Sequence, residues 1–78
     1  MTERAPPGYE ILRVSDHNYE DLVAEISHES AYIATITREP GRDFEIELAD
    51  ATARDGYRRL NLAEFLRAVE IARARLEP

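Results

Sequence analysis

The chain has 78 residues, of which 44% are hydrophobic and 33% are charged, with no cysteine and a formal net charge of −6. This length allows one small domain with a single core, in which a deeply enclosed active site is hard to build. The missing cysteines exclude disulfides and thiolate zinc sites. The acidic balance disfavours nucleic-acid binding, which draws its affinity from Lys and Arg.

The N-terminal segment and the apolar runs bear on domain organisation and location. Residues 1–8 contain two prolines, a glycine and charges without periodicity, so we expect a flexible leader before a single α+β domain over residues 9–78. The segment lacks the basic and apolar stretches of a signal peptide, and no apolar run approaches the ~20 residues of a membrane span. We therefore expect a cytoplasmic protein that makes no membrane contact.

Charge is unevenly distributed along the chain. Residues 1–53 carry twelve acids and four bases, whereas residues 54–78 carry six arginines and four acids. If the first part forms a sheet and the second a helix, the sheet is acidic and could attract a basic protein partner. The alternative is that these charges only keep a small protein in solution.

Four strands are predicted in the first 48 residues. Residues 9–14 and 31–37 are rich in β-branched and aromatic side chains, and residues 44–48 alternate apolar and acidic ones. Residues 22–28 are interpreted as a strand because the following strand needs a hairpin partner. One or two helical turns over residues 19–26 are the competing interpretation. Pro40 and Gly41 give the clearest turn between strands.

The connection between the second and third predicted strands is short. Glu29 and Ser30 form a two-residue loop in this interpretation, although neither is ideal for the positive φ angles of a primed turn. Such a loop pairs Ile26 with Ile33. A shift of one residue in this register would exchange the two faces of the strand.

The best-supported element is a C-terminal helix. Asn61 is a good N-cap, Glu64 completes a capping-box pattern, and Leu60 can pack onto Phe65 across the cap. One apolar stripe recurs at helical spacing and contains Leu62, Phe65, Leu66, Val69, Ala72 and Leu76. The predicted fold is therefore α+β, a four-stranded antiparallel β-meander packed by one C-terminal amphipathic helix (ββββα).

The strand over residues 31–37 is apolar on both faces if its side chains simply alternate. One face would carry Tyr32, Ala34 and Ile36, and the other Ala31, Ile33, Thr35 and Thr37.

One helix covers only one face of a four-stranded sheet. We therefore expect the outer face to stay open and to bind a second copy of the chain or another protein, the alternative being scattered exposed apolar residues without a role. The candidate partner-binding residues are Val23, Tyr32, Ile36, Glu45 and Glu47.

No motif in the sequence predicts catalysis, a cofactor or a metal site. His28 has serine and glutamate neighbours, but consecutive residues of a hairpin cannot converge into a hydrolase relay. His17 lies among acids in a turn, where side chains are typically just solvated. An alternative function, a small-ligand or nucleotide-binding accessory protein, would use Tyr57, Arg58 and Arg59 beside the helix start.

The segments YEDLVAEI (residues 19–26), FEIE (44–47) and LNLAEFL (60–66), with the hairpin between them, resemble a group of short uncharacterised bacterial proteins. The resemblance spans residues 9–76, consists of core patterning and implies no established activity. Small acidic proteins of this general shape sometimes resemble immunity proteins that block toxins, an analogy at the level of fold. We expect a non-enzymatic protein-interaction module, either a homodimer or an immunity-like partner binder.

Overall fold

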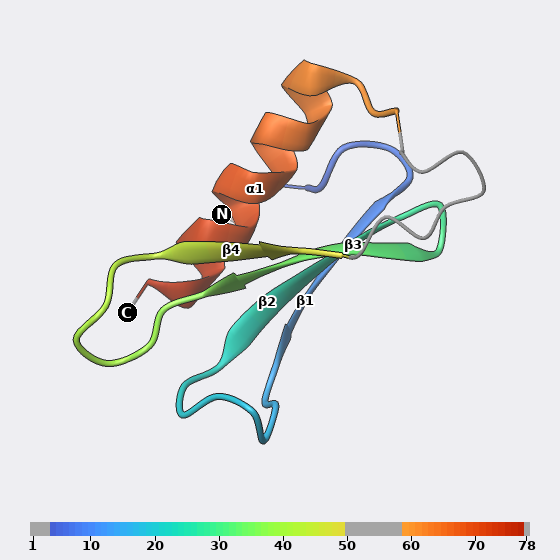
Figure 1. Cartoon of the computed structure of the whole chain (residues 1–78). Coiled ribbons are helices and arrows are strands. Elements are labelled where there is room, and N and C mark those ends of the chain that lie inside the picture. Colours follow the sequence, from blue (N-terminus) through green and yellow to red (C-terminus); the bar gives the residue numbers. More distant parts are fainter. Residues whose placement is uncertain (1–3, 50–58, 78) are drawn as a thin grey trace.

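A computed structural model describes residues 4–49 and 59–77 (Figure 1). The described residues form a four-stranded antiparallel sheet of order β1-β2-β3-β4 and one helix. The strands are β1 (Tyr9–Val14), β2 (Val23–His28), β3 (Ala31–Thr37) and β4 (Glu45–Leu48), and the helix is α1 (Leu62–Leu76). This arrangement confirms the predicted ββββα fold.

Local sequence signals place the ends of α1. The side chain of Asn61 accepts a hydrogen bond from the backbone N–H of Glu64 at 3.0 Å, which confirms the predicted N-cap. In the last turn Arg73 forms ion pairs with Glu70 at 3.2 Å and Glu77 at 2.7 Å. The basic side chain also complements the negative end of the helix dipole.

The β2–β3 hairpin has the predicted two-residue loop. Glu29 and Ser30 adopt φ angles of 50° and 66°, the left-handed pair that a type I′ turn requires. The glutamate N–H donates to the Gly8 carbonyl at 2.9 Å, so the tip of the hairpin is also tied to the segment before β1. This second tether supports a turn that the two residue types disfavour.

The predicted register of this hairpin is wrong beyond its first two pairs. Ser27 lies opposite Tyr32, but Ile26 lies opposite Ala34, because a β-bulge inserts Ile33 into β3. The isoleucine and the following alanine both join the core beside the helix, whereas Tyr32 remains on the other side of the sheet. The bulge therefore sorts the apolar side chains of β3 onto one face, which simple alternation could not do.

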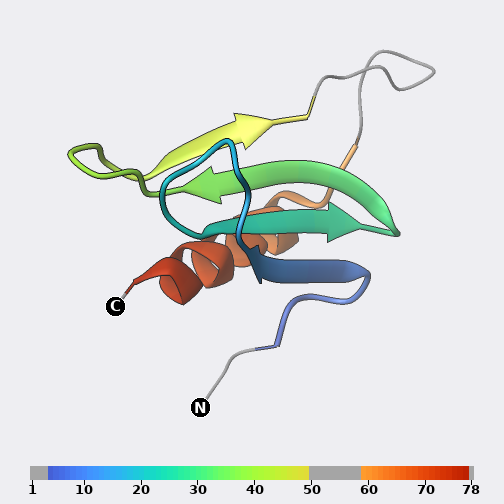
Figure 2. The same ribbon diagram turned by 90° about the horizontal axis from the view of Figure 1, so that it is seen from below.

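The core lies between α1 and one side of the sheet, here called the helix-bearing face. Figure 2 shows α1 behind β1, β2 and β3, with β4 beyond its edge, and the helix contacts only those three strands. The buried cluster contains Tyr9, Ile11, Ala24, Ile26, Ile33, Ala34, Ile36, Ala68, Ile71 and Ala72. The small alanines on both layers let the helix approach the sheet closely.

The opposite side of the sheet, the outer face, is partly covered by the chain itself. Figure 2 shows the β1–β2 loop, residues 15–22, crossing over β2 and β3. The carboxylate of Glu39 accepts the N–H groups of Glu20 and Asp21 at 3.0 and 3.1 Å, and the Tyr19 hydroxyl donates to Glu47 on β4. The expectation of an open outer face is therefore wrong for its centre, because a loop as well as a helix shields the sheet.

Part of the predicted leader belongs to the packed domain. Pro6 is buried, Ala5 packs against the core, and the Tyr9 N–H donates to the Pro6 carbonyl at 3.0 Å. Gly8 adopts a φ of 83°, which glycine tolerates without strain. Residues 6–9 therefore form a turn that leads into β1.

Candidate protein-interaction surface

The five partner-binding residues predicted from the sequence do not form one accessible surface. Val23 is only 1% exposed on the outer face, and Ile36 is 3% exposed on the helix-bearing face. Tyr32 is 46% exposed, and its hydroxyl is hydrogen-bonded to the side chain of Thr35. The bulge and the covering loop together remove two of the predicted contacts, while Tyr32 and the two glutamates of β4 remain exposed.

The residues of the alternative ligand site are only partly placed. Tyr57 and Arg58 lie outside the described residues. Arg59 is exposed, immediately before the segment that leads into α1. Arg59 does not belong to the lining of the cleft described below.

The exposed aliphatic side chains of β4 lie on the helix-bearing face. Ile46 pairs with Ile36 and Leu48 pairs with Ala34, and both partners belong to the core beneath α1. Paired residues of an antiparallel sheet project to the same side. Nevertheless Ile46 is 42% and Leu48 69% exposed, because α1 does not reach β4.

The flank of α1 that faces β4 also exposes aliphatic side chains. Leu62 and Leu66 are 70% and 53% exposed. They share a helical face with Arg73, whose guanidinium lies 5.6 Å from the ring centroid of Phe44, just before β4. On this ground we assign the two leucines to the β4 side of the helix, and we call them, together with Ile46 and Leu48, the β4–α1 surface.

The edge of β4 beside this surface is open in the described part of the chain. The Ala49 N–H donates to the Ile33 carbonyl at 2.9 Å, so Ala49 directs its backbone groups towards β3. Because bonded and non-bonded pairs alternate, the N–H and C=O groups of Ile46 and Leu48 point away from β3. An aliphatic row thus lies beside backbone groups that have no partner in the described residues.

On the outer face, every charged residue of the four strands is a glutamate. The strand pairing places Glu10, Glu25, Glu45 and Glu47 on this face, with no Lys or Arg among them. The guanidinium of Arg42, in the β3–β4 connection, pairs with Glu45 at 3.2 Å. The two sides of β4 therefore differ sharply, with aliphatic side chains on one side and carboxylates on the other.

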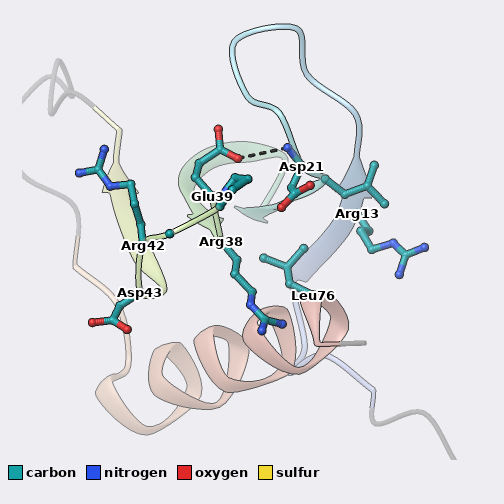
Figure 3. Close-up of a pocket in the computed structure, with 10 residues that line it drawn as sticks. Arg13, Asp21, Arg38, Glu39, Arg42, Asp43 and Leu76 are labelled. Atoms are coloured by element: carbon teal, nitrogen blue, oxygen red, sulfur yellow. Dashed lines mark hydrogen bonds between the residues drawn. The ribbon is translucent and has the colours of Figure 1, made fainter.

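A separate cleft of about 670 Å³ lies between the β1–β2 loop, the β3–β4 connection and the end of α1 (Figure 3). Figure 3 shows Arg38 reaching towards the helix end and Glu39 bonded to the β1–β2 loop. Positive and negative side chains balance in its lining, with Arg13, Arg38 and Arg42 beside Asp21, Glu39 and Asp43. Such a lining selects neither an anion nor a cation.

Two tyrosines have perturbed acidities, and both serve the fold. The hydrogen bond to Glu47 and, to a smaller extent, burial raise the pKa of Tyr19 to about 12. Burial, followed by the negative charge of Glu64, raises the pKa of Tyr9. The Tyr9 ring packs 4.7 Å from the ring of His28, centroid to centroid. Both phenols are neutral at neutral pH in any case, and the raised pKa values extend that neutral range to higher pH.

Comparisons with family models, with curated proteins and with solved structures return no match to this chain. The resemblance to short bacterial proteins stays a prediction. In the described part of the chain, α1 falls short of the length and apolarity that a membrane-spanning helix needs. The function is therefore inferred from the surface of this structure.

Proposed function

We propose that the chain is a protein-interaction module that binds another protein through the β4–α1 surface. The observation that carries the proposal is that four aliphatic side chains of β4 and α1 are each more than 40% exposed, while β4 is an edge strand of the described sheet. Covering this surface would remove apolar area from water and satisfy backbone groups at the same time. The site differs from the predicted outer face, whose centre is already covered.

A different protein fits this surface better than a second copy of the chain. In a symmetric dimer the two copies of β4 would pair antiparallel, with both helices on the same side of the joint sheet. A pairing over three residues of β4 then places Glu47 opposite Glu47, or Glu45 opposite Glu47. Like charges directly opposite each other destabilise a strand pair. The homodimer expected from the sequence is therefore the competing outcome, and an acidic edge favours a heteromeric complex.

Site-specific photo-crosslinking in the cells that produce the protein tests this proposal. A photoreactive residue at position 48 or 66 should give one discrete adduct, identified by mass spectrometry as a different protein. Position 12 is the matched control, because Leu12 is also an exposed leucine, at 48%, but lies on the outer face of β1. Adding Leu62→Glu to the position-48 variant should abolish the adduct.

Three results would contradict the proposal. Equal adduct yields at positions 12 and 48 would show nonspecific contact. An adduct of the chain with itself, together with a dimer in sedimentation equilibrium, would establish the competing homodimer. The absence of any adduct at positions 48 and 66 in folded protein would leave the surface without a partner.

A further inference from the structure

The geometry of β4 also indicates the chemistry of the partner, an inference that rests on the proposed function. We infer that the partner contributes an extended strand that pairs with the open edge of β4 and alternates aliphatic and basic residues. Its aliphatic side chains would lie over the helix-bearing side, and its Lys or Arg side chains over the outer side.

The backbone of β4 determines that the partner segment is extended. Ile46 and Leu48 direct their N–H and C=O groups to the edge, two residues apart, which matches the repeat of a β-strand and not that of a helix. Since β4 has four residues, a partner segment of about five to seven residues covers the edge. Main-chain hydrogen bonds of this kind supply affinity without sequence preference, so specificity must come from side chains.

The helix-bearing side determines one half of the partner's side chains. A strand added at the edge of β4 places every second side chain beside Ile46 and Leu48, opposite the flank of α1. That flank offers Leu62 and Leu66, both more than half exposed. Aliphatic residues at these alternate positions would complete the apolar layer that α1 leaves unfinished over β4.

The outer side determines the other half. The intervening side chains of the added strand lie beside Glu45 and Glu47, both exposed. The β1–β2 loop, which crosses this face, adds the acids Asp16, Glu20 and Asp21 and contains no Lys or Arg. Arg42 offsets part of the charge of Glu45, and the Tyr19 hydroxyl occupies one acceptor position of Glu47. The remaining field is negative, so basic side chains are favoured at these positions.

Synthetic peptides test this inference directly, with binding followed by titration and by the backbone amide NMR signals of the full chain. The probe is acetyl-Thr-Lys-Val-Lys-Val-Lys-Thr-amide, and the control replaces every Lys with Glu. The basic peptide should bind about tenfold or more tightly than the acidic one, because each basic side chain opposite a glutamate favours binding and each acidic side chain there opposes it. Signals of Ile46 and Leu48 should shift most.

Two matched comparisons separate strand pairing from general charge attraction. Methylating the backbone nitrogens of either the Lys residues or the Val residues of the peptide should give opposite results, because successive N–H groups of a strand point to opposite edges. One of these two methylated peptides should lose binding, and the other should bind as the unmethylated peptide does. Glu45→Gln with Glu47→Gln should remove the preference for the basic peptide. Glu10→Gln with Glu25→Gln, the acids at the far side of the outer face, should leave that preference unchanged.

The outcomes distinguish this inference from the function on which it rests. Equal binding of the basic and acidic peptides, equal effects of the two methylated sets, or loss of preference in the Glu10→Gln, Glu25→Gln variant would overturn the strand chemistry. If those results accompany a discrete heteromeric adduct at position 48, the interaction surface stands and only the partner's pattern is wrong. If neither peptide binds and no adduct forms, both conclusions fail.

Discussion

The proposal for the β4–α1 surface leads to a quantitative prediction about stability. Side chains that are exposed for binding should contribute little to the free energy of folding. Ile26 is fully buried, so Ile26→Ala should cost about 2–5 kcal/mol through lost burial and a residual cavity. Complete burial of a Leu or Ile side chain is worth about 1.5–3 kcal/mol. Leu48 is 69% exposed and Ile46 42% exposed, so their replacement by Ala should cost only about 0.5–1 and 1–2 kcal/mol.

Urea unfolding followed by circular dichroism measures these differences. With a slope of about 1 kcal/mol per molar urea for a chain of this size, Leu48→Ala should lower the midpoint by about 0.5–1 M, and Ile26→Ala by about 2 M or more. If Ile26→Ala is unfolded without urea, Ile26→Val replaces it, with an expected cost of about 0.5–1.5 kcal/mol. A cost above about 2 kcal/mol for Leu48→Ala would show that β4 packs within the chain and would refute the reasoning.

Three further predictions concern local structure. Gly8→Ala and Gly41→Ala should each lower the free energy of unfolding by about 1–2 kcal/mol, measured by thermal unfolding, since both glycines have φ near 80°. An added Cβ has close neighbours at Gly8 but none at Gly41, so a much larger loss of stability at Gly8 would show that steric contact and not backbone strain dominates there. Tyr19→Phe should cost about 0.5–1.5 kcal/mol through the lost bond to Glu47. Because the folded pKa of Tyr19 is about 12, above its ordinary 10.0, the native protein should keep this stabilisation below pH 10 and lose it as the pH rises towards 12, a dependence that the phenylalanine variant should lack. Asn61→Ala should lower the free energy of unfolding by about 0.5–2 kcal/mol through the lost cap. A urea midpoint of the helical circular dichroism signal equal to that of the native chain would argue against the cap.

Several features of this protein are determined by short stretches of its sequence. The cap at Asn61 is local, so the start of α1 could be predicted. The predicted apolar stripe is only partly correct, because Leu62 and Leu66 are exposed, whereas Ala68 and Ile71, which lie outside that stripe, are buried. The two-residue loop at Glu29 and Ser30 follows from the short distance between two apolar runs. The uneven distribution of acids along the chain predicts an acidic sheet, and the alternation over residues 44–48 places Glu45 and Glu47 on the same side of it.

The binding surface depends on arrangements that no local pattern contains. The bulge at Ile33 exchanges the faces of β3, and its position follows from packing across β2, β3 and the helix, since one inserted residue reverses all later side chains. The β1–β2 loop covers the outer face through bonds of Glu39 and Glu47 to residues far away in sequence. The close fit of α1 on three strands leaves the fourth uncovered, and only this lateral offset exposes Leu48. Periodicity tells which side chains share a face, but tertiary packing alone decides which part of that face the helix reaches.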